Sequence, residues 1–420
     1  MAGVLNCSYA QETNKEKKLK FSFSERIRLT TIDNAILLDN DADIWTFTRF
    51  RTYAGVDYAP VKNLDFRFQL GNEARVWFSP ASKHPGLNEI FVNQLYINWK
   101  NIAGIPLNIK AGRQNIMLDE GFICLDGQPL TGSRSAYFNA LRGDYKINDK
   151  NSITAFVSYN TDTEEFLPLI NAQDPAQALE EQTNTGMGVY YKSKLKPVDL
   201  SVYYFLKHTF DNEAYPIESG INVIGARGVV PMGKQFKLVA EGGYQFGTAG
   251  DNDRSAFGGY AHFDYKLPQS IPVANLISVG GFYLSGDDPA TDKVEGWDPL
   301  WSRWPKWSES YIYTLIIENA GKVAYWSNIS SLNVNLNGKL SDNVSFKSSY
   351  HRLMAPEDNL SDFCGGTGSV RGDLFIIKTM YKIDDHWSGH LLWENFTPGN
   401  FYAEDADGYN WVRFELMYKF

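Results

Sequence analysis

The chain has 420 residues, with 40 Lys and Arg against 49 Asp and Glu, and a formal net charge of −9 at pH 7. This acidic balance lacks the basic footprint of a nucleic-acid binder, so we expect no nucleic-acid partner. Hydrophobic residues make up 43% and charged residues 21%, a balance that excludes a disordered chain. The unusual quantity is the aromatic content, with 11 Trp, 24 Tyr and 26 Phe.

Residues 1–18 are expected to lie outside the folded domain as a signal-peptide remnant or a flexible N-terminus, and residues 19–420 to form one domain. Ser8-Tyr9-Ala10 resembles the end of a secretory signal whose basic start and apolar middle are missing. A lipid anchor at Cys7 is disfavoured because Asn6 precedes it. Apolar runs stay short of the roughly 20 residues that a membrane-spanning helix needs, which excludes a helical membrane protein.

Polar and apolar residues alternate from residue 19 onward. Phe21 and Phe23 share one parity, and Ser22 and Ser24 share the other. This two-residue period is typical of a β-strand with one apolar and one polar face, and many of the segments exceed the usual ~5–6 residues of globular strands. We predict strands near residues 19–30, 44–58, 64–78, 89–100, 106–117, 136–147, 151–160, 185–194, 198–208, 221–230, 235–247, 254–266, 273–285, 329–339, 343–353, 371–383, 387–397 and 409–420.

The connections between these strands are of two kinds. Short turns alternate for much of the chain with long loops near residues 161–184, 209–220, 286–328, 354–370 and 398–408. Such alternation is typical of outer-membrane barrels, which have short periplasmic turns and long extracellular loops. The polar face carries too many charged residues for a packed interior, whereas about eighteen strands can enclose an aqueous lumen. We therefore predict an all-β fold: one transmembrane antiparallel β-barrel, with its aromatic excess at the two membrane interfaces.

The end of the chain supports this fold. Val412, Phe414 and Tyr418 alternate with polar residues up to the terminal Phe420. A final strand that ends on an aromatic residue resembles the signal read by the barrel-assembly machinery of the outer membrane, although a final strand can also end in Phe by chance.

Several segments resemble the alginate-export family of outer-membrane barrels. The pieces that carry the resemblance are Ile109-Lys110-Ala111-Gly112-Arg113-Gln114, Asp126-Gly127-Gln128-Pro129, Arg134, Tyr137-Phe138-Asn139-Ala140-Leu141-Arg142, Leu284-Ser285-Gly286-Asp287, Asp298-Pro299-Leu300 and Arg303-Trp304-Pro305. Their order and spacing match that family over roughly residues 20–420. The resemblance implies an 18-stranded monomeric barrel of the Gram-negative outer membrane, in contact with lipid and lipopolysaccharide, that passes an anionic polysaccharide passively.

The polar parity indicates where such a solute would travel. A polymer with one carboxylate per sugar needs cations along its path, and Arg suits this role because its planar fork binds carboxylates. The candidate pore-lining residues are Arg26, Arg28, Arg49, Arg51, Arg67, Arg75, Arg113, Arg134 and Arg142. Arg113 shares the parity of Ile109 and Ala111, so a bulge would be needed to turn it inward. The alternative is that inward carboxylates such as Glu73 and Glu415 pair with these arginines and brace the wall.

The loop over residues 286–308 is rich in Trp. Trp297, Trp301, Trp304 and Trp307 lie within eleven residues. Indole rings stack on sugars or narrow a pore when a loop folds inward, so we name these residues as a candidate sugar-contact or constriction loop. An interfacial belt, or the loop's own small core, is the alternative.

Catalytic and cofactor motifs are not apparent in the sequence. Among the six His, His390 with Ser388 and Glu394 forms the one cluster of note, and it fits no known hydrolase pattern. We expect no enzyme activity, cofactor or metal site. The predicted function is an outer-membrane channel for passive diffusion of an anionic, alginate-like saccharide. The alternatives are a plugged scaffold barrel with periplasmic or outer-membrane partner proteins and, as the weaker one, an outer-membrane hydrolase.

Overall fold

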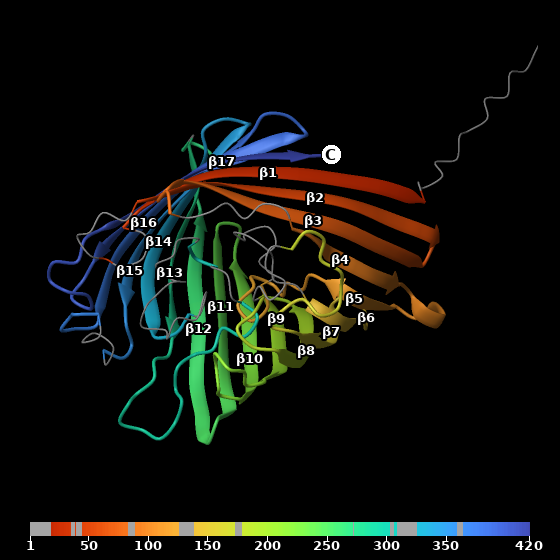
Figure 1. Cartoon of the computed structure of the whole chain (residues 1–420), viewed down its shortest axis with the longest axis horizontal. Coiled ribbons are helices and arrows are strands. Elements are labelled where there is room, and N and C mark those ends of the chain that lie inside the picture. The colour runs from red at the N-terminus through yellow and green to blue at the C-terminus, as the bar shows by residue number, and fades with distance from the viewer. Residues whose placement is uncertain are drawn as a thin grey trace, which may run out of the picture.

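The computed structural model describes residues 18–34, 38, 44–82, 89–125, 138–172, 179–271, 273–302, 306–308, 326–358 and 364–420. Within them, 18 antiparallel strands form one closed sheet, because β1 pairs with both β2 and β18 (Figure 1). The strands are β1 (Leu19–Asp33), β2 (Trp45–Val61), β3 (Leu64–Ser79), β4 (Ile90–Trp99), β5 (Leu107–Gln114), β6 (Phe138–Lys146), β7 (Asn151–Asn160), β8 (Asn184–Leu195), β9 (Val198–Thr209), β10 (Ser219–Met232), β11 (Phe236–Ala249), β12 (Asn252–Lys266), β13 (Ala274–Leu284), β14 (Ile329–Lys339), β15 (Val344–Met354), β16 (Val370–Lys382), β17 (Trp387–Pro398) and β18 (Tyr409–Lys419).

The alternating sequence pattern explains the two faces of this sheet. Phe21 and Leu29 in β1 are 67% and 43% exposed on the outside, whereas Arg26 and Arg28 between them are buried. Closing the sheet gives every strand two neighbours, so the backbone is paired without exposed edges in lipid. The prediction of an all-β barrel of about 18 strands is confirmed, with strand ends within a few residues of those expected.

The two ends of the barrel differ. At one end, strands join through brief turns such as Lys62-Asn63 between β2 and β3 and Lys196-Pro197 between β8 and β9. Most connections at the other end are long, although Gly250-Asp251 alone joins β11 to β12. Among the described residues, no helix has the length and apolar character needed to cross a membrane.

Two of the long connections turn into the barrel. Residues 115–125, after β5, and 285–302, after β13, pair with each other: Cys124 and Trp301 form an isolated parallel bridge. They pack on the inner face of the wall around β6–β13, where Phe205 of β9 and Trp301 approach with ring centroids 6.2 Å apart. The strand order puts this wall opposite β1–β3 (Figure 1). These loops therefore occupy the part of the interior beside β6–β13.

The predicted division into residues 1–18 and 19–420 stays an expectation. Residues 1–17, with Cys7 and the signal-like segment, lie outside the described part of the chain.

Candidate pore and its lining

An arginine face covers the inner side of β1, β2 and β3; we use this name for Arg26, Arg28, Arg49, Arg51 and Arg75. In the register, Arg28 lies opposite Arg49, which in turn lies opposite Arg75, and Arg26 lies opposite Arg51. Like charges on neighbouring strands repel one another, so this arrangement is suited to an anion that shares them.

Aromatic rings hold several of these guanidinium groups. The guanidinium carbons of Arg49 and Arg75 lie 5.5 and 4.9 Å from the ring centre of Phe47. Arg51 lies 4.9 Å from the ring centre of Tyr53. Such cation–π contacts contribute roughly 0.5–2 kcal/mol each and orient the guanidinium groups.

Two carboxylates lie among the arginines. Glu415 of β18 forms an ion pair with Arg28 and lies 3.2 Å from Nδ1 of His390. Glu73 lies opposite Arg51 in the register and accepts a 3.4 Å hydrogen bond from Tyr53. Counted over the described residues, two acidic groups lie among these five arginines, so this stretch of the inner face has a positive balance.

Both ring nitrogens of His390 have an interaction partner. Arg413 donates a 3.0 Å hydrogen bond through Nε to Nε2 of His390, so Nδ1 carries the proton that faces Glu415. Glu394 instead accepts a hydrogen bond from Ser308. The cluster of His390, Ser388 and Glu394 thus lacks the serine–histidine contact that a hydrolase needs.

The inward loops have a dense aromatic core. Phe122 stacks on Trp297 with ring centroids 5.2 Å apart. Trp301 meets Phe156 at 5.5 Å, and Trp307 stacks on Phe282 of β13 at 3.9 Å. These contacts fix both loops against the wall at many points.

A second set of contacts, which we call the latch, joins the loop after β5 to the wall by charge. Asp119 pairs with Lys192, accepts hydrogen bonds from Tyr190 at 2.5 Å and Ser201 at 2.9 Å, and lies 3.9 Å from Arg227. Burial by itself would raise the pKa of Asp119, but Lys192, Tyr190 and Ser201 outweigh that effect and hold it below its ordinary value.

Glu120 completes the latch. Its carboxylate accepts a 2.7 Å hydrogen bond from Arg227 and a 3.0 Å bond from Lys306 of the other inward loop, and lies 3.6 Å from His262. Burial opposes ionisation, yet His262, Lys306 and Arg227 hold the pKa of Glu120 well below its ordinary value. Both inward loops and the wall therefore meet at one carboxylate that stays ionised at neutral pH.

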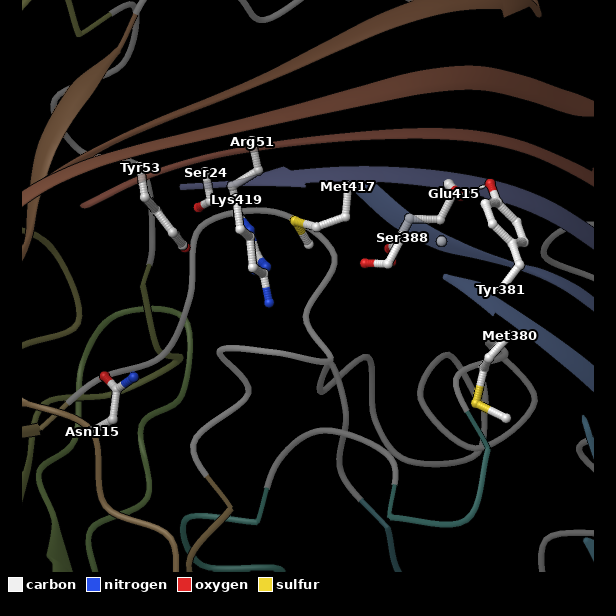
Figure 2. Close-up of a pocket in the computed structure, with 11 residues that line it drawn as sticks. Ser24, Arg51, Tyr53, Asn115, Met380, Tyr381, Ser388, Glu415, Met417 and Lys419 are labelled. Carbon is white, nitrogen blue, oxygen red and sulfur yellow. Dashed lines mark hydrogen bonds between the residues drawn. The ribbon is translucent and has the colours of Figure 1, made fainter. Parts of the chain in front are cut away.

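Between the arginine face and the loops lies a cavity of about 620 Å³. It opens below β1, β2 and β16–β18, and the base of the loop after β5 lies on its far side (Figure 2). The side chains that line it are Ser24, Arg51, Tyr53, Asn115, Met380, Tyr381, Ser388, Glu415, Met417 and Lys419, together with Gly389.

Comparison with known proteins identifies this barrel. The sequence model of a family described as "Alginate export" matches residues 64–414, more than half of the chain. The chain belongs to the alginate export family. As a family member with a porin-like barrel it is an outer-membrane channel of a Gram-negative bacterium. The resemblance predicted from the sequence pieces is confirmed. No curated protein sequence matches the chain.

Solved structures show the same barrel fold at low sequence identity. Pseudomonas aeruginosa OccK7 (OpdD) is 12% identical, with a TM-score of 0.60 over 96% of this chain and 99% of that one. P. aeruginosa OccK2 (OpdF), in a complex with glucuronate, is also 12% identical, with a TM-score of 0.59 over 96% and 97% of the two chains. P. aeruginosa OccD3 (OpdP) is 10% identical, with a TM-score of 0.55 over 95% and 91%.

In this alginate-export barrel, Arg67 and Arg142 lie apart from the arginine face. Arg67 pairs with Asp57 at 2.5 Å and donates to Gln94 at 2.7 Å. Arg142 pairs with Asp144 of its own strand at 2.8 Å. Arg67 and Arg142 are therefore paired with carboxylates of the wall, as in the alternative given above. Arg134 lies outside the described residues.

Arg113 does not line the lumen, which corrects that part of the prediction. It lies opposite Leu95, an exposed outer-face residue, and its register with both neighbouring strands runs without a shift. Its guanidinium binds both carboxylate oxygens of Glu164, at 2.6 and 2.8 Å, and donates to the carbonyl oxygen of Val92 at 2.9 Å. The loop after β7 folds over the rim and buries this pair, because Ile170 of the same loop exchanges backbone hydrogen bonds with Ile90.

Trp297, Trp301 and Trp307 pack against other side chains, as in the alternative of a small loop core. Trp297 is 1% and Trp301 5% exposed, so neither presents a ring face to a passing sugar. Trp307 packs on Phe282, and Trp304 lies outside the described residues. Constriction of the lumen by this loop stays a prediction.

Sequence reasoning missed the latch and the far side of the cavity. Asp119 and Glu120 form an acidic pair in a non-strand segment, and their partners Arg227 and Lys306 lie more than 100 residues away along the chain. Strand parity carries no information about such loop contacts. The one available signal was that acidic pair within an otherwise apolar stretch from Ile116 to Leu125.

Proposed function

We propose that this barrel is a passive channel for anionic saccharides, whose carboxylates pass along the arginine face. The observation that carries the proposal is the continuous cross-strand register of Arg26–Arg51 and Arg28–Arg49–Arg75 on one inner wall. Support comes from two independent sources: the family is described by alginate export, and a barrel of the same fold has been solved with glucuronate. Alginate and glucuronate share a uronate carboxylate on a sugar ring.

The chemistry of the arginine face suits this cargo. A guanidinium fork binds a carboxylate through two parallel hydrogen bonds, and the low-dielectric wall strengthens the attraction. Several arginines lie opposite one another on neighbouring strands, so a carboxylate can leave one guanidinium group as it reaches the next and is not held at one place. Transport of this kind needs no nucleotide and has no intrinsic direction.

The test is ion selectivity in a planar bilayer under a KCl gradient. Arg49→Ala with Arg51→Ala should shift the reversal potential toward cation preference, whereas Lys at both positions should largely keep the anion preference because the charge remains. Lys194→Ala, at the exposed short-turn end of β8, is the matched control. An unchanged reversal potential in the double Ala variant would contradict the proposal.

A plugged scaffold barrel is the second candidate, and the inward loops favour it. They lie inside the barrel and are bound to the wall through Asp119, Glu120 and the aromatic core. A correctly folded protein that gives no current, and that co-purifies with other envelope proteins, would support the scaffold and exclude the channel.

A further inference from the structure

The cavity under the arginine face is the size of a small-molecule site. Its volume of about 620 Å³ lies within the range of roughly 300–1,000 Å³ typical of ligand pockets. The cavity is therefore large enough to hold a small-molecule ligand.

Its polar groups converge from opposite sides. Arg51, a buried cation, enters from β2, and Lys419 enters from the end of β18 (Figure 2). Across the cavity, Oδ1 of Asn115 is a buried acceptor that has no hydrogen-bond partner within the described residues. Ser24 and Ser388 add hydroxyl groups to the lining. A fitting ligand thus carries an anionic group on one side and a hydroxyl donor on the other.

Apolar groups complete the lining. The thioether side chains of Met417 and Met380 reach the cavity, and the ring of Tyr53 supports Arg51. Methionine is polarizable and adapts its shape, so it packs well on the C–H face of a sugar ring. The one acidic side chain in the lining, Glu415, is itself paired with Arg28, which reduces its repulsion of an anion.

We propose that this cavity is a binding site for a single sugar acid. The carboxylate faces Arg51, a ring hydroxyl donates to Oδ1 of Asn115, and the C–H face lies against Met417. The choice of a sugar acid as the ligand rests on the proposed function. The location of the binding site and the size of its ligand go beyond that function. The barrel then holds a short uronate at equilibrium, whether or not ions flow.

The experiment measures the equilibrium binding of sodium glucuronate to the detergent-solubilised barrel by isothermal titration calorimetry. We expect saturable binding of one equivalent, with glucose binding more weakly because it lacks the anion. Asn115→Ala and Ser388→Ala should each weaken binding by about threefold to tenfold, the usual effect of one lost hydrogen bond. Asn343→Ala, in the exposed turn between β14 and β15, is the matched control and should bind as the unchanged protein does.

The outcomes separate this inference from the channel proposal. Anion-selective current with no saturable glucuronate binding, or with binding that Asn115→Ala leaves intact, would overturn the cavity site while the channel stands. Saturable, Asn115-dependent binding without anion-selective current would support the site and contradict the channel. The heat-dependent gel mobility of folded barrels shows in each case that the variant has folded.

Discussion

At the scale of single residues, the neighbours of each arginine decide its role. Arg49 and Arg75 share the ring of Phe47, which orients their guanidinium groups. Arg67 and Arg142 instead lie beside Asp57 and Asp144. Arginine therefore has two roles in the wall. Arg49 and Arg75 stack on an aromatic ring of the arginine face, whereas Arg67 and Arg142 form ion pairs with neighbouring carboxylates.

Arg113 gives a prediction at this scale. Removing one partner of a buried ion pair costs about 3–5 kcal/mol, because the other charge stays buried and unpaired. Arg113→Ala should therefore lower stability against urea markedly and leave ion selectivity unchanged, since the pair with Glu164 lies at the outer rim. A double variant that also carries Glu164→Gln should be less destabilised than the sum of the two single variants. A change of reversal potential in Arg113→Ala would contradict this placement.

At the scale of elements, the loop after β5 is held by two kinds of contact. The aromatic core resists separation by hydrophobic burial, and the latch adds charge-assisted hydrogen bonds that orient Asp119 and Glu120. The described part of the loop is thus held on the inner side of the wall by both kinds of contact.

Glu120→Gln tests the latch. The amide keeps the shape of the side chain but removes the charge that binds Arg227 and Lys306, so the loop should leave the wall more often. Single-channel recordings should show a larger and noisier open current. Asp149→Asn, in the exposed turn between β6 and β7, is the matched control. Identical current and noise in both variants would show that the aromatic core suffices.

The attachment of the loop through the latch should depend on pH. The pKa of Glu120 is held below its ordinary value, so its contribution to stability is complete above the ordinary carboxyl range and is lost as the pH falls through and below that range. Current noise should therefore stay constant around neutral pH and rise reversibly in acid. In Glu120→Gln, that acid-induced rise should be reduced, because the carboxyl is no longer there to titrate.

At the scale of the whole molecule, charge is distributed unevenly. The arginine face is positive, whereas Asp287, Asp288, Glu295 and Glu357 gather at the long-loop end; burial and these neighbouring carboxylates raise the pKa of Glu357. A polyanion would meet repulsion at this mouth and attraction further inside. Short saccharides, with few charges, are less hindered by such a mouth than long polymers.

The lipid-facing surface yields a prediction for the whole barrel. Val279, midway along β13, is 53% exposed on the outer face beside Val334 of β14. Val279→Arg should destabilise the folded barrel by about 2–4 kcal/mol, the cost of a basic residue near the bilayer midplane. Ser349→Arg, beside the exposed Lys347 on the inner face of β15, should cost much less. Equal urea midpoints for the two variants would contradict the assignment of faces.

Sequence reasoning predicted the wall well and the interior poorly. Strand period and parity are local properties, so they placed every strand and put Arg26, Arg28, Arg49 and Arg51 on the inner side. Arg113 has the outer-face parity that its strand pattern indicated, but its ion pair with Glu164 of the loop after β7 could not be predicted from that pattern. The burial of Trp297 likewise depends on where its loop docks. Such contacts join distant segments, and no periodic pattern records them.

The pairing of the two inward loops has a consequence for the order of assembly. Cys124 and Trp301 meet across 177 residues of chain (301 − 124), which include β6–β13. Contacts of such long sequence separation form late, since much entropy is lost before they are made. The filling of the lumen must therefore follow the delivery of most of the wall. We therefore expect the lumen of a folding barrel to stay wider until these two loops have docked on the wall.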